Sequence, residues 1–229
     1  MSNSIHQKRK TSHLPRYGTI TIDIGSPKLG NLGWHLYEPV DDSYQEYSGK
    51  KLDDLIDLVT IKSKNHGFIL GLEAPLFIPV RKNLYHATKA RYGESPRPWS
   101  AGAGAQVLAI NLPIMTYLFE KLHHKKPTIQ FCISPKEFQS KPQQILIFEA
   151  LVSGKDKGTS HIDDAKIMND YCKKFSQSNT LPPTILKPEP EINYMNLAVC
   201  ALLYCEKHNY LNDINTPSPI YKPQTSKEQ

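Results

Sequence analysis

The chain has 229 residues, of which 39% are hydrophobic, so it can bury one sizeable core and we expect a single domain. Residues 1–16 lack the apolar segment of a signal peptide, and the longest apolar run, residues 197–205, is too short to span a bilayer. The four cysteines show no CxxC spacing, which favours buried thiols and a cytoplasmic protein, while the net charge of +6 permits a nucleic-acid partner without requiring one.

The first half of the chain predicts a hairpin, a helix and a buried strand. After a disordered basic tail at residues 1–16, we expect strands at 18–25 and 32–37, a helix at 51–59 and a strand from 68 to 73 that Pro75 ends. Residues 75–100 then form an irregular basic loop, and a loop of this length is usually functional or mobile.

The second half predicts two further strands and three helices. We expect strands near 128–133 and 144–149, and helices at 101–122, 160–175 and 193–207. A loose C-terminal tail should occupy residues 212–229. A hairpin first, with helices between the later strands, predicts an α/β fold with a mixed sheet of about five strands flanked by helices.

Three of the predicted strands carry a carboxylate near their ends. Asp23, Glu73 and Glu149 each stand late in an apolar run, where an unpaired charge is costly. We therefore expect one group of acids on one sheet. The alternative for each of them is an ordinary capping or surface carboxylate.

The predicted helix at residues 160–175 adds a fourth acid. Its buried stripe consists of Ile162, Ala165, Met168, Cys172 and Phe175. At about 100° per residue, Asp164 lies roughly 80° from the centre of this stripe and Asp163 roughly 180°, so Asp164 should reach the sheet while Asp163 faces water. His161 lies one turn before Asp164 on the same side, where it either joins the site or packs on the core.

Four carboxylates cannot lie together unneutralised, so either a cation binds or their pKa values rise. All-oxygen ligation suits Mg²⁺ or Mn²⁺, and two such ions can activate water and stabilise the leaving oxygen in phosphodiester cleavage. We therefore predict a catalytic site of four acids. These are Asp23, Glu73, Glu149 and Asp164.

The motifs around these acids resemble those of a known superfamily. They are Ile22-Asp23-Ile24-Gly25, Gly71-Leu72-Glu73-Ala74-Pro75 and His161-Ile162-Asp163-Asp164-Ala165. In type and order they are similar to motifs of the ribonuclease H-like superfamily, and more narrowly of a bacterial nuclease group related to RuvC-type resolvases. The resemblance extends over about residues 18–205 and implies a ribonuclease H-like domain at 17–211, with metal held by Asp23, Glu73 and Asp164. The chain departs from the pattern at Glu149, where it has Glu instead of Asp.

The basic loop at residues 75–100 supplies candidate contacts to a substrate. The predicted substrate-binding residues are Arg81, Arg91, Arg97, Trp99 and His161. The three arginines would hold phosphates, and Trp99 or Tyr92 would stack on a base. Alternatively, the two aromatic side chains simply cover the core.

The main functional prediction is a Mg²⁺- or Mn²⁺-dependent nuclease, a hydrolase acting on DNA or RNA, with a homodimer left open as its assembly. Two other functions stay open. An actin-like-kinase-type nucleotide-binding protein would use residues 23–26 as a phosphate loop, although the chain is short for two lobes and has no second Gly-rich phosphate turn after a strand. A non-catalytic binding module would keep the fold without the activity.

Overall fold

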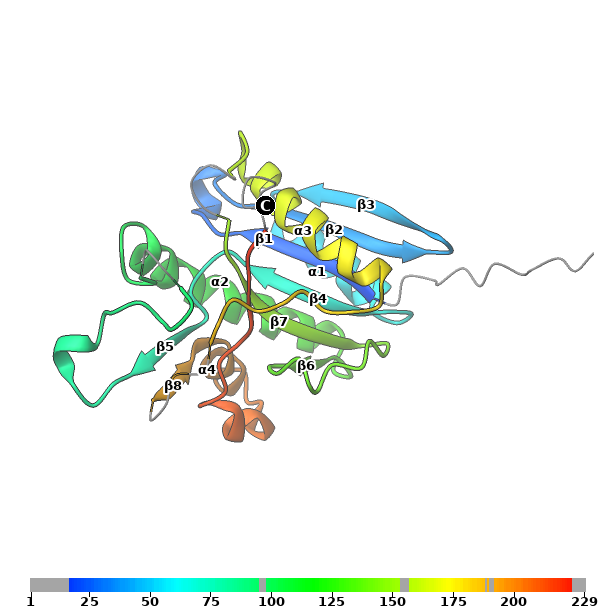
Figure 1. The fold of residues 1–229 in the computed structure, drawn as a ribbon. Coiled ribbons are helices and arrows are strands. Elements are labelled where there is room, and N and C mark those ends of the chain that lie inside the picture. Colours follow the sequence, from blue (N-terminus) through cyan, green and yellow to red (C-terminus); the bar gives the residue numbers. More distant parts are fainter. Residues whose placement is uncertain (1–16, 95–97, 153–156, 188, 190–191, 224–229) are drawn as a thin grey trace, which may run out of the picture.

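The structure is a computed structural model that describes residues 17–94, 98–152, 157–187, 189 and 192–223 (Figure 1). The strands of its main sheet are β1 (Tyr17–Asp23), β2 (Gly33–Val40), β3 (Ser43–Gly49), β4 (Gly67–Leu72), β6 (Gln130–Cys132), β7 (Gln144–Ala150) and β9 (Ile220–Tyr221). They are arranged in the order β3-β2-β1-β4-β7, with β6 and β9 both on the outer edge of β7. The tail predicted at residues 1–16 lies outside the described residues.

The strand β1 lies at the centre of this sheet and is buried along its whole length. It pairs antiparallel with β2 and parallel with β4, and β4 runs parallel to β7. The prediction of an α/β fold with a mixed sheet is confirmed, and the arrangement is compatible with a ribonuclease H-like fold. The predicted number of about five strands is wrong, because β3 and β9 extend the main sheet to seven strands.

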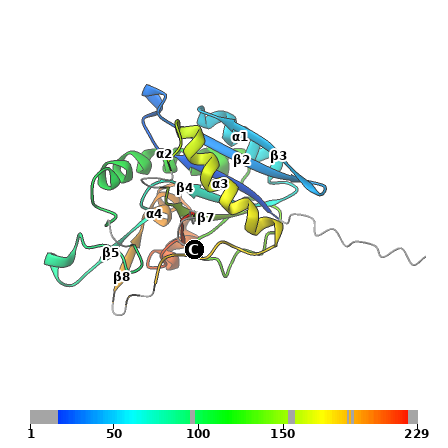
Figure 2. The ribbon, with the colours of Figure 1, turned by 45° about the horizontal axis from the view of Figure 1, so that its top comes forward.

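Helices cover both faces of the sheet. They are α1 (Leu52–Lys62), α2 (Gly104–Lys125), α3 (His161–Gln177) and α4 (Leu197–Tyr204). Residues of α1, α2 and α4 share one core with Ile20 and Ile22 of β1, whereas Met168 and Cys172 of α3 join Tyr17 in a second core. Figures 1 and 2 show α3 crossing one face of the sheet while α1 and α2 lie behind it. Among the described residues, no helix is long and apolar enough to cross a membrane.

The alternation of side chains along the strands decides which acids face α3. Ile22 of β1 and Leu72 of β4 belong to the core shared with α1, α2 and α4. Successive side chains of a strand point to opposite faces, so the next residues, Asp23 and Glu73, are directed to the α3 side. The sequence thus places two acids on one face at the carboxyl ends of neighbouring parallel strands.

Two short strands outside the main sheet correct the predicted elements. β5 (Phe77–Val80) and β8 (Asn193–Asn196) form a separate antiparallel pair. The segment 75–100 is therefore not irregular throughout, since it contains β5 and a 3-10 turn at Leu84–His86. The helix predicted to begin at residue 193 begins only at Leu197, because β8 takes the residues before it.

The prediction of a loose tail after residue 212 is wrong for the part that the structure describes. A 3-10 helix at His208–Asp213 leads into β9. The side chains of Ile220 and Tyr221 are fully buried, and both residues pair with β7. This terminal segment is part of the core of the domain.

Candidate metal centre

Three of the predicted acids meet at one end of the sheet. Asp23 ends β1, Glu73 follows β4, and Asp164 lies in the first turn of α3. Each offers one carboxylate oxygen to a group in which these atoms all lie within 4.8 Å of one another. We refer to Asp23, Glu73 and Asp164 as the acidic cluster. The three residues that we predicted as metal ligands therefore lie together.

The register between β1 and β4 brings the first two acids side by side. Ile22 lies opposite Leu72 in the parallel ladder, and the amide N–H of Glu73 donates to the carbonyl oxygen of Ile22 at 2.9 Å. This bond holds Glu73 at the level of Asp23 although β4 has already ended. Both side chains then point to the same face, as the alternation of the strands requires.

A glycine on β2 allows α3 to approach this end of the sheet. Gly33 is the partner of Asp23 in the β1–β2 ladder. A Cβ atom on Gly33 would lie only 2.4 Å from the backbone carbon of His161 and from the backbone nitrogen of Ile162. The absence of a side chain therefore lets the first turn of α3 pack directly on the sheet, next to Asp23.

The orientation of α3 confirms that Asp164, rather than Asp163, faces the other acids. Asp164 is buried with 6% of its surface exposed. Asp163 instead accepts hydrogen bonds from the hydroxyl groups of Thr159 and Ser160 at the start of the helix, and Ser160 in turn caps the amide of Asp163. The helical periodicity in the sequence was sufficient to separate these two neighbours.

Within the acidic cluster, Glu73 has a strongly raised pKa. Burial, and then the negative charge of Asp23, raise the pKa of Glu73 well above its usual value. Its Oε2 atom is fully buried and has no hydrogen-bond partner among the described residues. A buried, unpartnered carboxylate oxygen is costly, so this atom is suited to a proton or a cation.

Lys157 is a member of the site that we did not predict. Its Nζ atom lies 3.2 Å from Oε1 of Glu73 and 3.3 Å from Oδ2 of Asp164. Burial alone would lower the pKa of Lys157, but the negative charges of Glu73 and Asp23 outweigh it and the pKa is raised. The one signal in the sequence is the position of this lysine beside Gly158, just before α3, where the Gly158 amide donates to Asp164 at 2.6 Å.

His161 joins the acidic cluster from the first residue of α3. Its Nδ1 atom contacts Oδ2 of Asp23, and 39% of its side chain is exposed. Of the two alternatives for His161, the structure therefore favours membership of the site over simple packing on the core. The contact fixes the orientation of the Asp23 carboxylate and leaves part of the imidazole open to solvent.

The prediction that Glu149 belongs to this group is wrong. Glu149 lies opposite Leu72 in the β4–β7 ladder. It also stands two residues after Ile147, on the same face of β7, and both Leu72 and Ile147 belong to the core of α1, α2 and α4. Glu149 therefore points to the face opposite α3. There it accepts hydrogen bonds from the Arg91 guanidinium at 2.5 and 2.7 Å and from the Leu76 amide at 3.0 Å.

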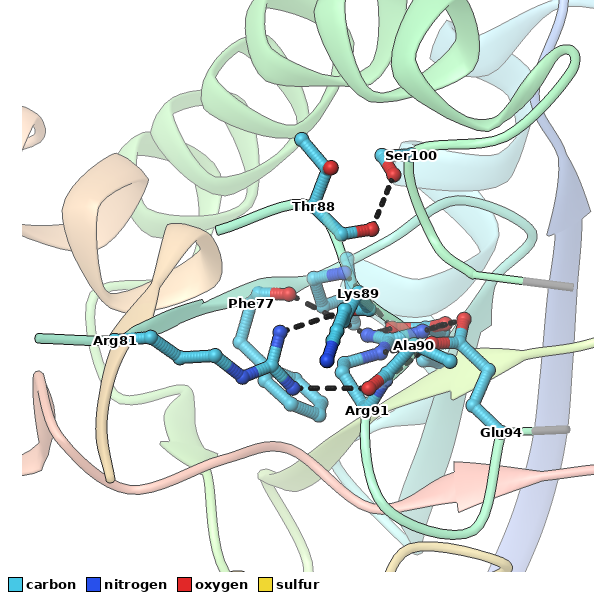
Figure 3. A network of polar contacts seen from close by, with 10 residues as sticks. Phe77, Arg81, Thr88, Lys89, Ala90, Arg91, Glu94 and Ser100 are labelled. Carbon is cyan, nitrogen blue, oxygen red and sulfur yellow. Dashed lines mark hydrogen bonds and ion pairs between the residues drawn. The ribbon is translucent and has the colours of Figure 1, made fainter. Parts of the chain in front are cut away.

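Arg91 is a buried structural residue in this structure and is not placed to bind phosphate. Its side chain is 1% exposed and also donates to both carboxylate oxygens of Glu94, at 2.6 and 3.0 Å. We refer to Arg91, Glu94 and Glu149 as the arginine cluster. Figure 3 shows Arg91 and Glu94 within the loop that follows β5.

The remaining residues predicted to bind substrate have separate places. Arg81 is 7% exposed at its side chain and is bonded to backbone carbonyl groups of its own loop and to Glu189, so it is not free to hold phosphate (Figure 3). Trp99 is half-buried, and Arg97 lies outside the described residues. Tyr92 is 57% exposed, so a base could reach its ring.

Comparisons with known proteins do not assign the chain to a family. No protein-family model, no curated protein and no solved structure matches it. The function must therefore be argued from the chemistry of the site.

The residues of the acidic cluster fit a divalent metal ion. Three carboxylates from three separate elements offer oxygens within 4.8 Å of one another, and Mg²⁺ and Mn²⁺ prefer oxygen ligands. The buried Oε2 of Glu73 provides an acceptor with no partner among the described residues. Asp23, Glu73 and Asp164 are the residues that would hold such an ion.

Proposed function

We propose that the protein is a Mg²⁺- or Mn²⁺-dependent nuclease of the ribonuclease H-like type. The observation that carries this proposal is the convergence of Asp23, Glu73 and Asp164 within 4.8 Å, at the carboxyl ends of two parallel strands and the start of α3. A divalent ion held there would supply an activated water and a counter-charge for the leaving oxygen of a phosphodiester.

The chain's own residues have distinct parts in this proposal. Asp23, oriented by His161, and Asp164, oriented by the Gly158 amide, supply carboxylates in fixed positions. Glu73 supplies the oxygen that has no partner among the described residues. Lys157, half exposed at the same place, is a cation that can move from the carboxylates to a phosphate of the substrate.

A non-catalytic binding module is the second candidate, and one observation favours it. The ammonium group of Lys157 already contacts Glu73 and Asp164, so part of the negative charge is neutralised within the chain. In that case the site would bind no divalent ion, and the fold would serve only to bind a partner.

Metal binding separates these functions. The wild type, Asp23→Asn and the matched control Asp163→Asn should be titrated with Mn²⁺ by calorimetry and tested on labelled single-stranded, duplex and branched nucleic acids. Asp163 neighbours the site but bonds to Thr159 and Ser160, so its variant should bind and cleave like the wild type. Asp23→Asn should lose both properties, because Asn keeps the shape and loses the charge that neutralises the ion.

Each other outcome has a defined meaning. A wild type that binds no Mn²⁺ would contradict the nuclease proposal and favour the non-catalytic module. Equal cleavage by the wild type and Asp23→Asn would indicate a contaminating nuclease. Binding of ATP, abolished by Asp23→Asn, would instead support the kinase-like alternative.

A further inference from the structure

Part of the segment that follows Glu73 forms, together with β8, an arm that stands away from the main sheet (Figure 1). It consists of β5, the loop at residues 81–92, and β8, which pairs with β5. Figures 1 and 2 both show β5 and β8 extending away from the body of the domain. The arm starts at Phe77, only a few residues after Glu73, so it leaves the sheet at the end that carries the acidic cluster.

The arm exposes large apolar and aromatic side chains. Tyr85 is 94% exposed and Leu84 is 84% exposed, both in the 3-10 turn at the tip of the loop. On the pair of strands, Ile78 lies opposite Met195, and the alternation of side chains adds Val80 to the same face. Val80 and Met195 are 47% and 42% exposed, whereas Ile78 packs against the main core, so the part of this face farther from the core is open to solvent.

This exposure does not come from an unstructured loop. The guanidinium of Arg81 donates to the carbonyl oxygens of His86, Lys89 and Ala90 at 2.8, 2.8 and 2.9 Å, which closes the loop around the arginine (Figure 3). The side chain of Asn83 accepts from the Tyr85 amide at 3.0 Å and caps the turn. The backbone that carries Tyr85 is therefore held in place before any partner binds, which lowers the entropy cost of binding.

The charges of the arm are positive. Residues 74–93 contain no Asp or Glu, and the first acid after them, Glu94, is buried against Arg91. Lys82 and Lys89, on either side of the turn, are both exposed. Glu189 contacts this loop from outside the segment, but it is paired with Arg81, which leaves Lys82 and Lys89 as the exposed charges next to the turn. An exposed tyrosine between exposed lysines is complementary to a polyanion whose bases are free to stack.

We propose that this arm binds a single-stranded segment of nucleic acid, with a base stacked on Tyr85 and the phosphates next to Lys82 and Lys89. The proposal deepens the nuclease function proposed above and rests on it for its biological meaning. The arm leaves the sheet just after Glu73, so a strand held on it would lie at the same end of the sheet as the acidic cluster. Unpaired bases are preferred because a duplex hides the faces that stack on tyrosine.

Binding can be measured without metal, so this test does not depend on cleavage. Fluorescence anisotropy in EDTA should compare labelled single-stranded DNA, single-stranded RNA and duplex DNA, using the full chain and Tyr85→Ala. We expect the single strands to bind more tightly than the duplex, and Tyr85→Ala to weaken their binding by about tenfold or more. Lys82→Gln should reduce the slope of log K against log salt concentration by about 0.7, the value for one phosphate contact on a single strand.

Matched controls distinguish the arm from general effects. Tyr204→Ala removes another tyrosine, which is 79% exposed at the end of α4. Lys64→Gln removes an exposed lysine at the opposite end of the sheet, just before β4 begins. Both should bind like the wild type. Unchanged binding by folded Tyr85→Ala would overturn the proposal, as would a dimer in sedimentation that Tyr85→Ala dissociates, since the arm would then contact a second copy.

The two proposals fail separately. Binding that depends on Tyr85, in a protein that binds no Mn²⁺ and cleaves nothing, would keep the arm and remove the nuclease function. Metal-dependent cleavage that Asp23→Asn abolishes and Tyr85→Ala leaves unchanged would keep the nuclease function and remove the arm.

Discussion

Two groups of acids lie at the ends of neighbouring strands in this protein, and they differ in how their charge is neutralised. In the arginine cluster, Glu149 and Glu94 both bond to one guanidinium at distances of 2.5 to 3.0 Å, and all three side chains are buried. In the acidic cluster, the half-exposed Lys157 contacts two of the three carboxylates, Glu73 at 3.2 Å and Asp164 at 3.3 Å, and Asp23 contacts His161 instead. The carboxylates of the arginine cluster are fully paired with a buried guanidinium, whereas the acidic cluster keeps an unpaired carboxylate oxygen among the described residues.

The difference teaches which buried acids are candidates for function. Both clusters start from the same sequence feature, a carboxylate late in an apolar strand. Arg91 and the Leu76 amide occupy both oxygens of Glu149, so that carboxylate has little capacity left for a ligand. Glu73 keeps a buried oxygen without a partner among the described residues, and its pKa is raised. The incompletely satisfied acid is the one that a metal ion would complete.

The largest effect on stability should come from removing the guanidinium of the arginine cluster. Arg91→Ala leaves Glu149 and Glu94 buried without their counter-charge, and we expect it to lower the free energy of unfolding by about 3–5 kcal/mol. Arg91→Lys keeps the charge but loses the two-pronged contact, so its effect should be intermediate. Urea unfolding measures both, and Asp23→Asn, which relieves repulsion, should unfold no more easily than the wild type. A loss under about 1 kcal/mol for Arg91→Ala would contradict the comparison.

A second prediction concerns the pH dependence of stability and of Mn²⁺ binding that Glu73 gives to the acidic cluster. Burial and the charge of Asp23 raise the pKa of Glu73 in the folded protein above its ordinary value of 4.5. At pH values above 4.5 and below the raised pKa, the native state therefore holds a proton that the unfolded chain has lost. The stability of the metal-free protein should therefore fall as pH rises through this window. Mn²⁺ must displace the same proton, so its affinity should rise with pH, by at most about tenfold per pH unit.

Urea unfolding in EDTA and Mn²⁺ calorimetry, at several pH values from about 6 to 8, test this dependence. Glu73→Gln should flatten the stability profile because Gln does not titrate. If the wild type and Glu73→Gln gave parallel profiles, the excess proton would belong to another group.

The smallest effect should come from removing the partial counter-charge of the acidic cluster. The side chain of Lys157 is 47% exposed, so Lys157→Met should lower the metal-free stability by at most about 1 kcal/mol. It should also strengthen Mn²⁺ binding severalfold, because the ammonium no longer competes for Glu73 and Asp164. Lys166→Met is a matched control on α3, where Lys166 pairs with Glu46 outside the cluster, and its Mn²⁺ affinity should be unchanged. Weaker Mn²⁺ binding by Lys157→Met would show that the lysine supports the metal instead of competing with it.

The sequence was informative wherever a local pattern determined the outcome. Helical periodicity separated Asp164 from Asp163, and the apolar runs located the strands of Asp23 and Glu73. Glu149 was misplaced because its face depends on the register between β4 and β7, which no local pattern reveals. The prediction that Arg91 binds phosphate was wrong for a related reason. The composition of a basic loop does not show which arginine will form an ion pair with a buried acid.

Elements with weak local signals were also missed. β3 is a largely exposed edge strand, so it lacks the apolar alternation that identifies a half-buried strand. β9 has only two residues, and its existence depends entirely on the edge of β7. Lys157 stands in a polar loop, and only the folded positions of Glu73 and Asp164 give it a role.

The late position of β9 in the chain has a consequence for synthesis on the ribosome. The outer edge of β7 is completed only when residues 219–221 arrive, because the Glu149 amide donates to the carbonyl of Pro219 and the Leu151 amide donates to that of Tyr221. Until then the part of this edge beyond β6 is unpaired, and Phe148 lacks the ring of Tyr221, whose centroid lies 4.7 Å from its own. The growing polypeptide therefore passes through a stage in which chaperones or neighbouring nascent chains can pair with β7 before β9 does.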